Sequence, residues 1–276
     1  IITEVTMAIA PMPSQTAYAA LAFSSFDRAV EGLRALAQDL PHGIRPDVVR
    51  LSDPDETRVS LGLAGRAGQA LAAYTKARRL PAACLVVLLW EGSDARSLRE
   101  RKLVAWDVLR RAGAVRMPSA IAHAWEKGRF SGPYLRDELM GHGVLVETLE
   151  TATSWANLIA LHNRVAAAIR AVSAEQGLPV IVQCHVSHVY GTGASLYFTV
   201  VAPEAADPLA QWRAVKTAAT AAIAEGGGTV THHHAVGTDH VDGLATEVGE
   251  LGMRVLRAVK DTLDPIGILN PGKLVP

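Results

Sequence analysis

The chain has 276 residues, enough for one large domain or two smaller ones, and 49% hydrophobic with 20% charged residues is the balance of a soluble globular protein. Its 27 Lys and Arg residues equal its 27 Asp and Glu residues, so no global field would attract nucleic acid or an anionic membrane. The longest apolar run, AACLVVLLW, is too short for a bilayer, which takes about 20 residues. The start IITEVTMAIAP has neither an initiator Met nor a charged signal region. We therefore expect a cytoplasmic segment from within a larger protein.

The first half of the chain alternates strand-like and helical patterns. Strands are predicted where apolar residues alternate or run together, over residues 1–10, 16–24, 46–53 and 82–91. Helices are predicted from the 3.6-residue period, over 25–40 with Ser25 as N-cap and from Asp94 to about Ala112. The following stretch to residue 142 is predicted to be irregular.

The second half shows the same patterns and one hairpin. A strand at 143–150 precedes a long helix with a glycine C-cap at Gly177. Residues 179–190 and 194–201 flank the turn GTG and predict a β-hairpin. Further helices are predicted over 208–224 and 241–262. Together the elements indicate an α+β fold, a mostly antiparallel sheet flanked by helices plus a C-terminal helical segment.

Several common catalytic and binding motifs are absent from the sequence. There is no GxGxxG after a strand, no P-loop GxxxxGK[ST], no GxSxG elbow and no HExxH pair. The two cysteines, Cys84 and Cys184, lie in apolar strand-like runs and are expected to be buried, inert thiols. No Gly-rich loop of known type therefore binds a nucleotide phosphate here.

The most unusual stretch is THHHAVGTDH at 231–240, with four of the ten histidines of the chain. Metal ligation, acid–base chemistry beside a cofactor and a merely polar loop are all compatible with it. Adjacent strand residues point to opposite faces, so at most His232 and His234 would share a metal ion. On this ground we expect no metal site.

Four motifs together resemble FAD-linked oxidases of the vanillyl-alcohol oxidase type. They are the tail LDPIGILNPGK, the run HHHAVG, the segment GPYLRDEL at 132–139 and the hairpin CHVSHVYGTGASLYF at 184–198. The opening IITEVT with its Pro-rich turn is similar to the end of that family's flavin-binding domain. HHHAVG replaces the common Glu-His-Gly step, and this variant resembles the alkyldihydroxyacetonephosphate synthase branch. The upstream part of the family's flavin-binding domain does not precede Ile1 in this sequence.

The resemblance implies a catalytic role for Tyr190 and for His232, His233 and His234. Tyr190 would be the general acid/base at the reacting carbon, and a nearby histidine or cation would assist its phenol. The histidines would relay protons or hold a phosphate. His188, two residues before Tyr190, is a candidate partner on the same strand face. A polar loop and a core tyrosine are the alternatives that the residues themselves leave open.

The resemblance also implies binding residues. Arg136 would contact the substrate and Arg50 would be needed for activity, since a guanidinium binds phosphate bidentately. Each arginine could instead pair with a structural acid such as Asp53 or Asp137. Four residues are implied to contact or support the flavin, namely Ile1, Ile2, Asn270 and Lys273.

The implied organisation has three parts: residues 1–10 as the last strand of the FAD-binding domain, 11–230 as the cap domain and 231–276 as a segment returning to the flavin. The implied activity is FAD-dependent exchange of the acyl group of acyl-dihydroxyacetone phosphate for a long-chain alcohol, with this segment inactive by itself. An FAD-dependent hydroxy acid or alcohol dehydrogenase, and a flavin-free binding or subunit-interaction module, are the alternatives. The implied partner is a phosphorylated lipid substrate, not nucleic acid. Peripheral membrane contact and a homodimer stay open.

Overall fold

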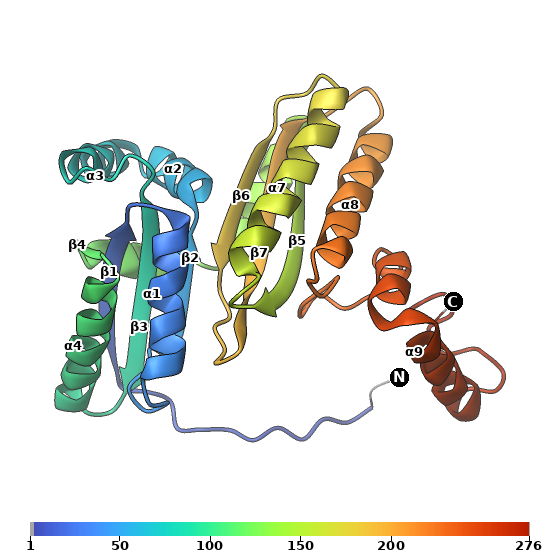
Figure 1. The fold of residues 1–276 in the computed structure, drawn as a ribbon, viewed down its shortest axis with the longest axis horizontal. Helices are drawn as coiled ribbons and strands as arrows, with labels where there is room; N and C mark the ends of the chain where they lie inside the picture. The colour runs from blue at the N-terminus through green and yellow to red at the C-terminus, as the bar shows by residue number, and fades with distance from the viewer. Residues whose placement is uncertain (1–2, 276) are drawn as a thin grey trace.

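Seven strands form one antiparallel sheet in the computed structural model, which describes residues 3–275. The order across the sheet is β4-β1-β3-β2-β6-β7-β5, and every neighbouring pair is antiparallel. The strands are β1 (Gln15–Phe23), β2 (Val48–Ser52), β3 (Cys84–Gly92), β4 (Val115–Met117), β5 (Val144–Ser154), β6 (Ile181–Val186) and β7 (Gly193–Pro203). The helices are α1 (Phe26–Asp39), α2 (Pro54–Leu63), α3 (Gly65–Ala77), α4 (Ala95–Arg111), α5 (Ala120–Gly128), α6 (Gly132–Gly141), α7 (Leu158–Glu175), α8 (Pro208–Glu225) and α9 (Val241–Leu263). The α+β prediction is confirmed (Figure 1).

Local capping explains why two predicted helices begin where they do. Ser25 accepts a hydrogen bond from the backbone N–H of Arg28 at 3.3 Å, and Asp94 accepts from those of Arg96 and Ser97 at 3.0 and 3.1 Å. Each cap satisfies backbone donors that the first helical turn leaves unpaired. The predictions for α1 and α4 are therefore confirmed to within a residue or two.

Two predicted stretches differ from the structure. Residues 113–142 are not irregular, because β4, α5 and α6 lie there. Both helices are short and neither has a side-chain N-cap, so the sequence gives neither a long apolar period nor a capping signal for them. Residues 3–13 form no strand: the segment is exposed and runs unpaired from β1 toward α9 (Figure 1). A strand requires a hydrogen-bonded partner, and within residues 3–275 none lies beside it.

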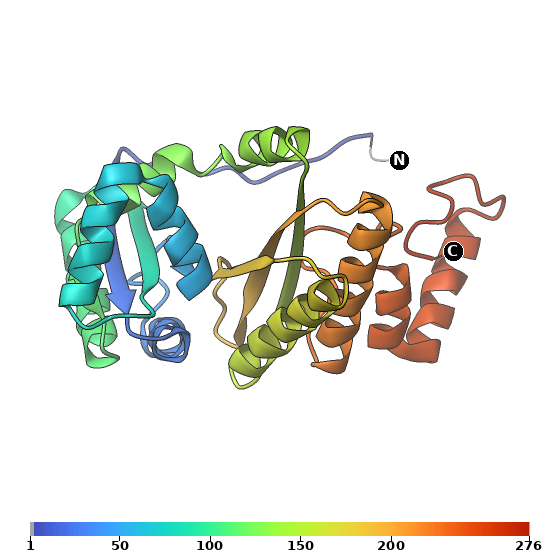
Figure 2. The ribbon, with the colours of Figure 1, turned by 90° about the horizontal axis from the view of Figure 1, so that it is seen from above.

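The core divides the sheet into two different halves. The larger cluster packs α1, α4, α7 and α8 on one face, around fully buried Phe23, Trp90 and Phe198. A smaller cluster packs α2, α3 and α5 on the opposite face. On the sheet side, this cluster consists of residues of β1, β3 and β4, together with Val48 of β2. Figure 2 shows α7 and α8 on one side of the β5–β7 half and α6 on the other. The second face of β5, β6 and β7 is thereby left largely without helical cover.

Polar residues line this second face, which we call the open face. Leu149 and Leu196 point into the large cluster, so their strand neighbours Glu150 and Tyr197 point the other way. Glu150 is opposite Tyr197 in the β5–β7 register, and Tyr197 is opposite His185 in the β6–β7 register. A row of titratable side chains therefore crosses three strands of the open face.

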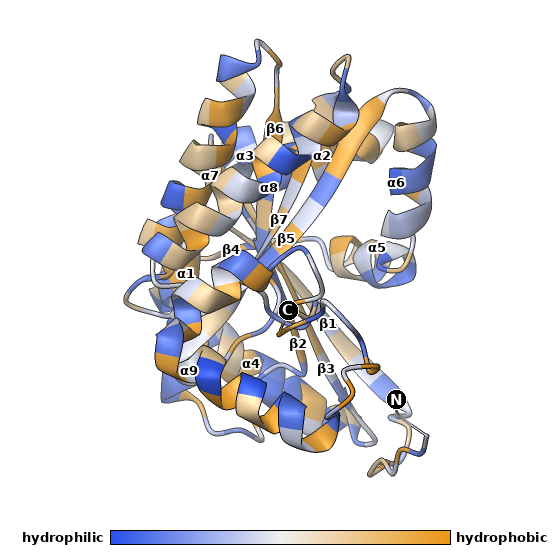
Figure 3. Ribbon diagram, turned by 90° about the vertical axis from the view of Figure 1, so that its right-hand side faces the viewer, coloured by the Kyte–Doolittle hydropathy of each residue, from blue (hydrophilic) through white to orange (hydrophobic). Residues whose placement is uncertain are grey.

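The last helix, α9, carries an exposed apolar stripe. Leu251, Val255, Val259 and Leu263 recur at helical spacing and remain largely exposed. Apolar segments recur along this helix in Figure 3. Helix α9 is amphipathic. Among residues 3–275, neither α9 nor any other helix has the length and apolar character that a membrane span needs.

Candidate active site

Three imidazoles surround one buried carboxyl group on the open face. Glu150 of β5 is only 5% exposed. Its Oε1 lies 3.4 Å from Nδ1 of His188 and 3.3 Å from Nδ1 of His232, and its Oε2 lies 3.5 Å from Nε2 of His234. Burial lowers the pKa of His188, while Glu150 acts in the opposite direction and the neighbouring histidines oppose its protonation. We call Glu150, His188, His232, His233 and His234 the histidine cluster.

Backbone hydrogen bonds to the free edge of β5 position the histidines. The N–H of His232 donates to the carbonyl of Glu150 at 3.1 Å, and that of Thr229 donates to the carbonyl of Ala152 at 3.0 Å. The Thr151 hydroxyl adds a bond to the carbonyl of Thr229 at 2.7 Å. Residues 229–232 therefore cover a strand edge that would otherwise expose unpaired backbone groups.

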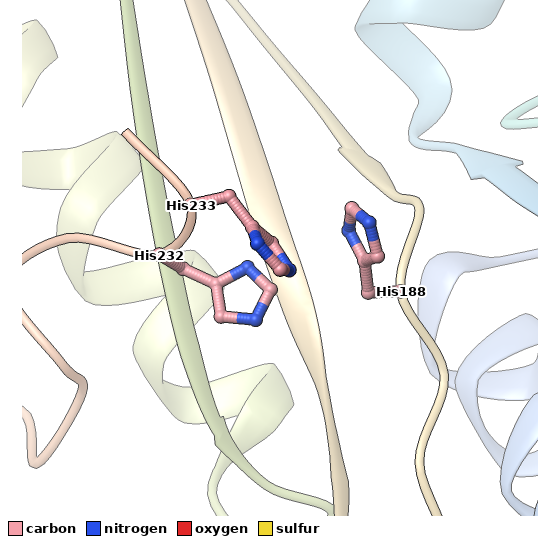
Figure 4. A group of neighbouring side chains, drawn as sticks. All are labelled: His188, His232 and His233. Carbon is pink, nitrogen blue, oxygen red and sulfur yellow. The ribbon is translucent and has the colours of Figure 1, made fainter. Parts of the chain in front are cut away.

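The histidine run is a turn, so the expected strand alternation is wrong. His233 and Ala235 have φ of 61° and 64°, a left-handed conformation that residues other than glycine adopt at an energetic cost. As a result, ring nitrogens of His188, His232 and His233 lie within 4.8 Å of one another, and their side chains converge (Figure 4). Strand geometry thus gives no argument against a shared metal ion, and the absence of a metal site stays a prediction.

Tyr190 joins the cluster through its hydroxyl. This oxygen lies 3.2 Å from Nε2 of His232, whose Nδ1 faces Glu150, so a phenol, an imidazole and a carboxyl follow in series. The Tyr190 side chain is 43% exposed, while its backbone is held by Gly193, whose carbonyl accepts its N–H at 2.8 Å, and by the Trp155 indole, which donates to its carbonyl at 3.0 Å. The histidine beside this phenol is His232; within residues 3–275 no hydrogen bond or ring contact joins Tyr190 to His188, the partner suggested by the sequence.

The two glycines of the loop after Tyr190 have different surroundings. A Cβ on Gly193 would lie 2.0 Å from the carbonyl oxygen of Thr153, whereas a Cβ on Gly191 would meet nothing within 4 Å. Gly193 is therefore needed because β5 and β7 approach closely at the base of the Tyr190 loop.

Alanine at these two glycines should have unequal effects. We expect Gly193→Ala to lower the free energy of unfolding by roughly 1–3 kcal/mol, because the added methyl group forces two strands apart. Gly191→Ala is the matched control and should stay within about 0.5 kcal/mol of the wild type. Urea unfolding of both variants measures the difference, and equal destabilisation would disprove the close-contact explanation.

Arg50 of β2 lies beside the open face, on the same side of the sheet, and is paired with an acid. Its Nη2 donates to Oε1 of Glu56 at 2.7 Å, and Nδ1 of His185 lies 3.0 Å from the same oxygen. Burial alone would raise the pKa of Glu56, but His185 and Arg50 outweigh it and lower that pKa to about 2. The structural acid is thus Glu56 rather than Asp53, which instead caps α2 by accepting the N–H of Glu56 at 2.8 Å. A substrate-binding role for Arg50 stays a prediction.

Arg136 is placed away from the histidine cluster. It lies exposed on α6, pairs with its neighbour Asp137 at 3.1 Å and lines a hollow with Glu147, Leu209 and Trp212. Glu147 points to the α8 face, since Trp212 donates to it at 2.6 Å. Within residues 3–275 no hydrogen bond or ion pair connects Arg136 to the cluster. The hollow beside Arg136 does not include Tyr190, so the predicted substrate contact of Arg136 gains no support from the structure.

The C-terminal motif reaches the histidine turn. Asn270 has φ of 45°, its carbonyl accepts the N–H of Lys273 at 3.2 Å, and the N–H of Leu274 donates to the carbonyl of Gly237 at 3.3 Å. The NPGK turn thus lies against the end of HHHAVG, and a supporting role of Asn270 and Lys273 at the flavin stays a prediction. Ile1 and Ile2, predicted to contact the flavin, lie outside the described residues.

Sequence reasoning missed the two buried acids. Glu150 and Glu56 contact most of the titratable side chains on this side of the sheet, yet each lies in an ordinary strand or helix pattern that contains other acids as well. The available signal was the alternation in GVLVETLE, where an acid follows a core leucine and so points to the opposite face.

The family model for the C-terminal domain of FAD linked oxidases matches residues 12–274. The chain belongs to this family. Alkyldihydroxyacetonephosphate synthase of Dictyostelium discoideum is 30% identical to it over 288 residues, covering 100% of this chain and 46% of that protein. The synthase of Trypanosoma brucei brucei is 29% identical over 287 residues with the same coverage. A solved alkyldihydroxyacetonephosphate synthase structure superposes with a TM-score of 0.74 at 26% identity, covering 95% of this chain and 46% of that one.

The family resemblance inferred from the motifs is thus confirmed. This FAD-linked oxidase domain spans about half the length of the curated relatives that it matches. FAD is the cofactor that the family name implies, and the synthases align with the whole length of the chain.

Proposed function

We propose that this chain is the cap and C-terminal part of an FAD-dependent enzyme of the alkyldihydroxyacetonephosphate synthase type. The reaction would convert acyl-dihydroxyacetone phosphate and a long-chain alcohol into the alkyl ether and a free fatty acid. The observation that carries the proposal is the series Tyr190–His232–Glu150 on the open face, in a chain that matches such synthases from end to end. A phenol that contacts an imidazole, which in turn contacts a carboxyl group, has the geometry of an assisted acid/base.

In this proposal Tyr190 moves the proton at the carbon that bears the ester. Its hydroxyl passes the proton to or from Nε2 of His232, 3.2 Å away. His233 and His234, both exposed beside it, are placed to relay further protons or to contact the phosphate of the substrate. Arg50 and Arg136 would attract that phosphate, Arg50 from the neighbouring strand β2 and Arg136 from the rim at α6.

The open face suits a planar cofactor. Helices cover this face of the β5–β7 half only in part, where Glu56 of α2 meets His185 and where α6 lies beside β5, and Tyr190, His233 and His234 are exposed there. Bound FAD would supply an electron-accepting ring next to the reacting carbon. We place its attachment mainly outside residues 3–275, with the NPGK turn of Asn270 and Lys273 supporting the site, and we expect α9 to pack its apolar stripe against the flavin-binding half.

The test uses the full-length flavin-loaded enzyme with palmitoyl-dihydroxyacetone phosphate and hexadecanol, under anaerobic conditions. The proposal predicts one ether and one fatty acid per turnover, over many turnovers, with the flavin absorbance unchanged at the end. Flavin reduced by a panel of hydroxy acids or alcohols, without ether, would instead identify a dehydrogenase. A full-length protein that binds no flavin would point to a binding module and would equally refute the synthase.

A further inference from the structure

His232 contacts a different group with each ring nitrogen. Nε2 lies 3.2 Å from the Tyr190 hydroxyl, and Nδ1 lies 3.3 Å from Oε1 of Glu150. A neutral imidazole has one N–H and one acceptor nitrogen, so the partner of Nδ1 decides what Nε2 can do. The group beside Nδ1 therefore decides whether Nε2 can accept a proton from Tyr190, although Glu150 does not contact Tyr190.

The two facing atoms are buried and have no better partner. Glu150 is only 5% exposed. Within residues 3–275, neither Oε1 of Glu150 nor Nδ1 of His232 has a hydrogen bond of regular geometry. A buried polar atom left without a partner costs free energy, which favours a proton on Nδ1 directed at the carboxylate. The backbone bond from His232 N–H to the carbonyl of Glu150 holds the two residues at this separation.

We infer that Glu150 is a positioning residue that keeps His232 protonated at Nδ1, so that Nε2 is free to accept the proton of Tyr190. The role given to Tyr190 in this inference rests on the proposed function, whereas the contacts of His232 with Glu150 and Tyr190 do not. Glu150 also lies 3.4 and 3.5 Å from His188 and His234, so it stabilises whichever imidazole carries a positive charge.

Hydroxyl groups and aromatic rings also lie beside these imidazoles and affect the pH at which each histidine is protonated. His188 has the rings of His232 and His233 at 5.2 and 4.6 Å and the hydroxyls of Ser187 and Ser195 at 3.1 and 3.4 Å. The ring of His234 lies against that of Tyr197 at 5.4 Å. Within residues 3–275 Glu150 is the carboxyl group in ion-pair contact with these three histidines.

Glu150→Gln tests the inference because it keeps the size of the side chain and removes the charge. The glutamine amide can donate to Nδ1 of His232, which would put the ring proton on Nε2 and block acceptance from Tyr190. We expect kcat to fall by about 10²–10⁴-fold with little change in KM. Glu150→Asp retains the carboxylate, so its kcat should be at least a tenth of the wild-type kcat.

A second readout does not depend on activity. The exchange of the imidazole C2 proton for deuterium, followed by mass spectrometry across pH, gives a midpoint for individual histidines in the full-length protein. Because Glu150 favours the charged form of His188, Glu150→Gln should move the His188 midpoint to lower pH, while Glu150→Asp should not. All samples contain EDTA so that no metal ion contributes.

The outcomes separate this inference from the proposed function. Glu150→Gln with unchanged kcat, or with an unchanged His188 midpoint, would overturn the inference even if the ether forms. If no variant and no wild-type sample forms ether, the synthase proposal fails, and the His188 midpoint then decides alone whether Glu150 controls the cluster. Glu31→Gln, an exposed acid paired with Arg34 on α1, is the control that should change neither readout.

Discussion

Phenylalanine in place of Tyr190 is expected to lower kcat for ether formation by about 10²–10⁴-fold. The substitution removes only the hydroxyl that lies 3.2 Å from Nε2 of His232. The Tyr190 loop is held through backbone groups, and its side chain is 43% exposed, so the free energy of unfolding should stay within about 0.5 kcal/mol of the wild type. Ether yield by mass spectrometry and urea unfolding of the same samples give the two values.

The matched control for this variant is Tyr74→Phe on α3. Tyr74 also uses its hydroxyl, which accepts from Arg78 at 2.9 Å, but it lies against the other half of the sheet. We expect full activity from this control. If Tyr190→Phe retained more than a tenth of the wild-type rate, Tyr190 would not be the acid/base of the reaction.

Glu56→Gln is expected to lower the free energy of unfolding at pH 7 by about 3 kcal/mol. The pKa of Glu56 is about 2 in the folded protein and 4.5 when unperturbed, and each pKa unit corresponds to about 1.4 kcal/mol. The group is buried, so solvent does not screen its contacts with Arg50 and His185. Removing its charge would leave both basic side chains without their acid.

The pH dependence of this effect has a definite sign. Since folding lowers the pKa of Glu56, its contribution is present above pH 4.5 and is lost as the pH falls toward 2. The gap between wild type and Glu56→Gln should therefore narrow steadily below pH 4.5, as measured by urea unfolding at several pH values. Glu100→Gln, which breaks an exposed pair with Arg96, should cost less than about 1 kcal/mol at any pH. A gap that stayed constant from pH 7 to pH 3 would contradict the ion-pair account.

Local signals in the sequence were sufficient for most elements. The apolar run at 82–91 predicted β3, which is buried in the middle of its half of the sheet, and the period after Ser25 predicted α1. The HHHAVG and HVYGTG motifs predicted His232 and Tyr190 as candidate site residues, and the structure places their side chains in contact although 42 positions separate them. Motifs could thus indicate these two candidates, because each motif is a local property of the chain.

The arrangement of the site depended on contacts that no local pattern encodes. Glu150 meets His232 only because the chain returns along the free edge of β5 after α8. His233 adopts a positive φ within a turn, so strand alternation failed as a guide to which histidines share a face. The partner of Arg50 could not be chosen among several nearby acids until the β2–β6 register placed His185 beside Glu56.

The most direct test of the proposed exchange follows an oxygen atom. The full-length enzyme is supplied with unlabelled acyl-dihydroxyacetone phosphate and a long-chain alcohol that carries ¹⁸O in its hydroxyl, and the extracted lipids are analysed by mass. Substitution of the carboxylate by the alcohol predicts that the ether retains the ¹⁸O and that an equal amount of unlabelled fatty acid is released. An ether without the label, or a labelled ester in place of the ether, would contradict the account.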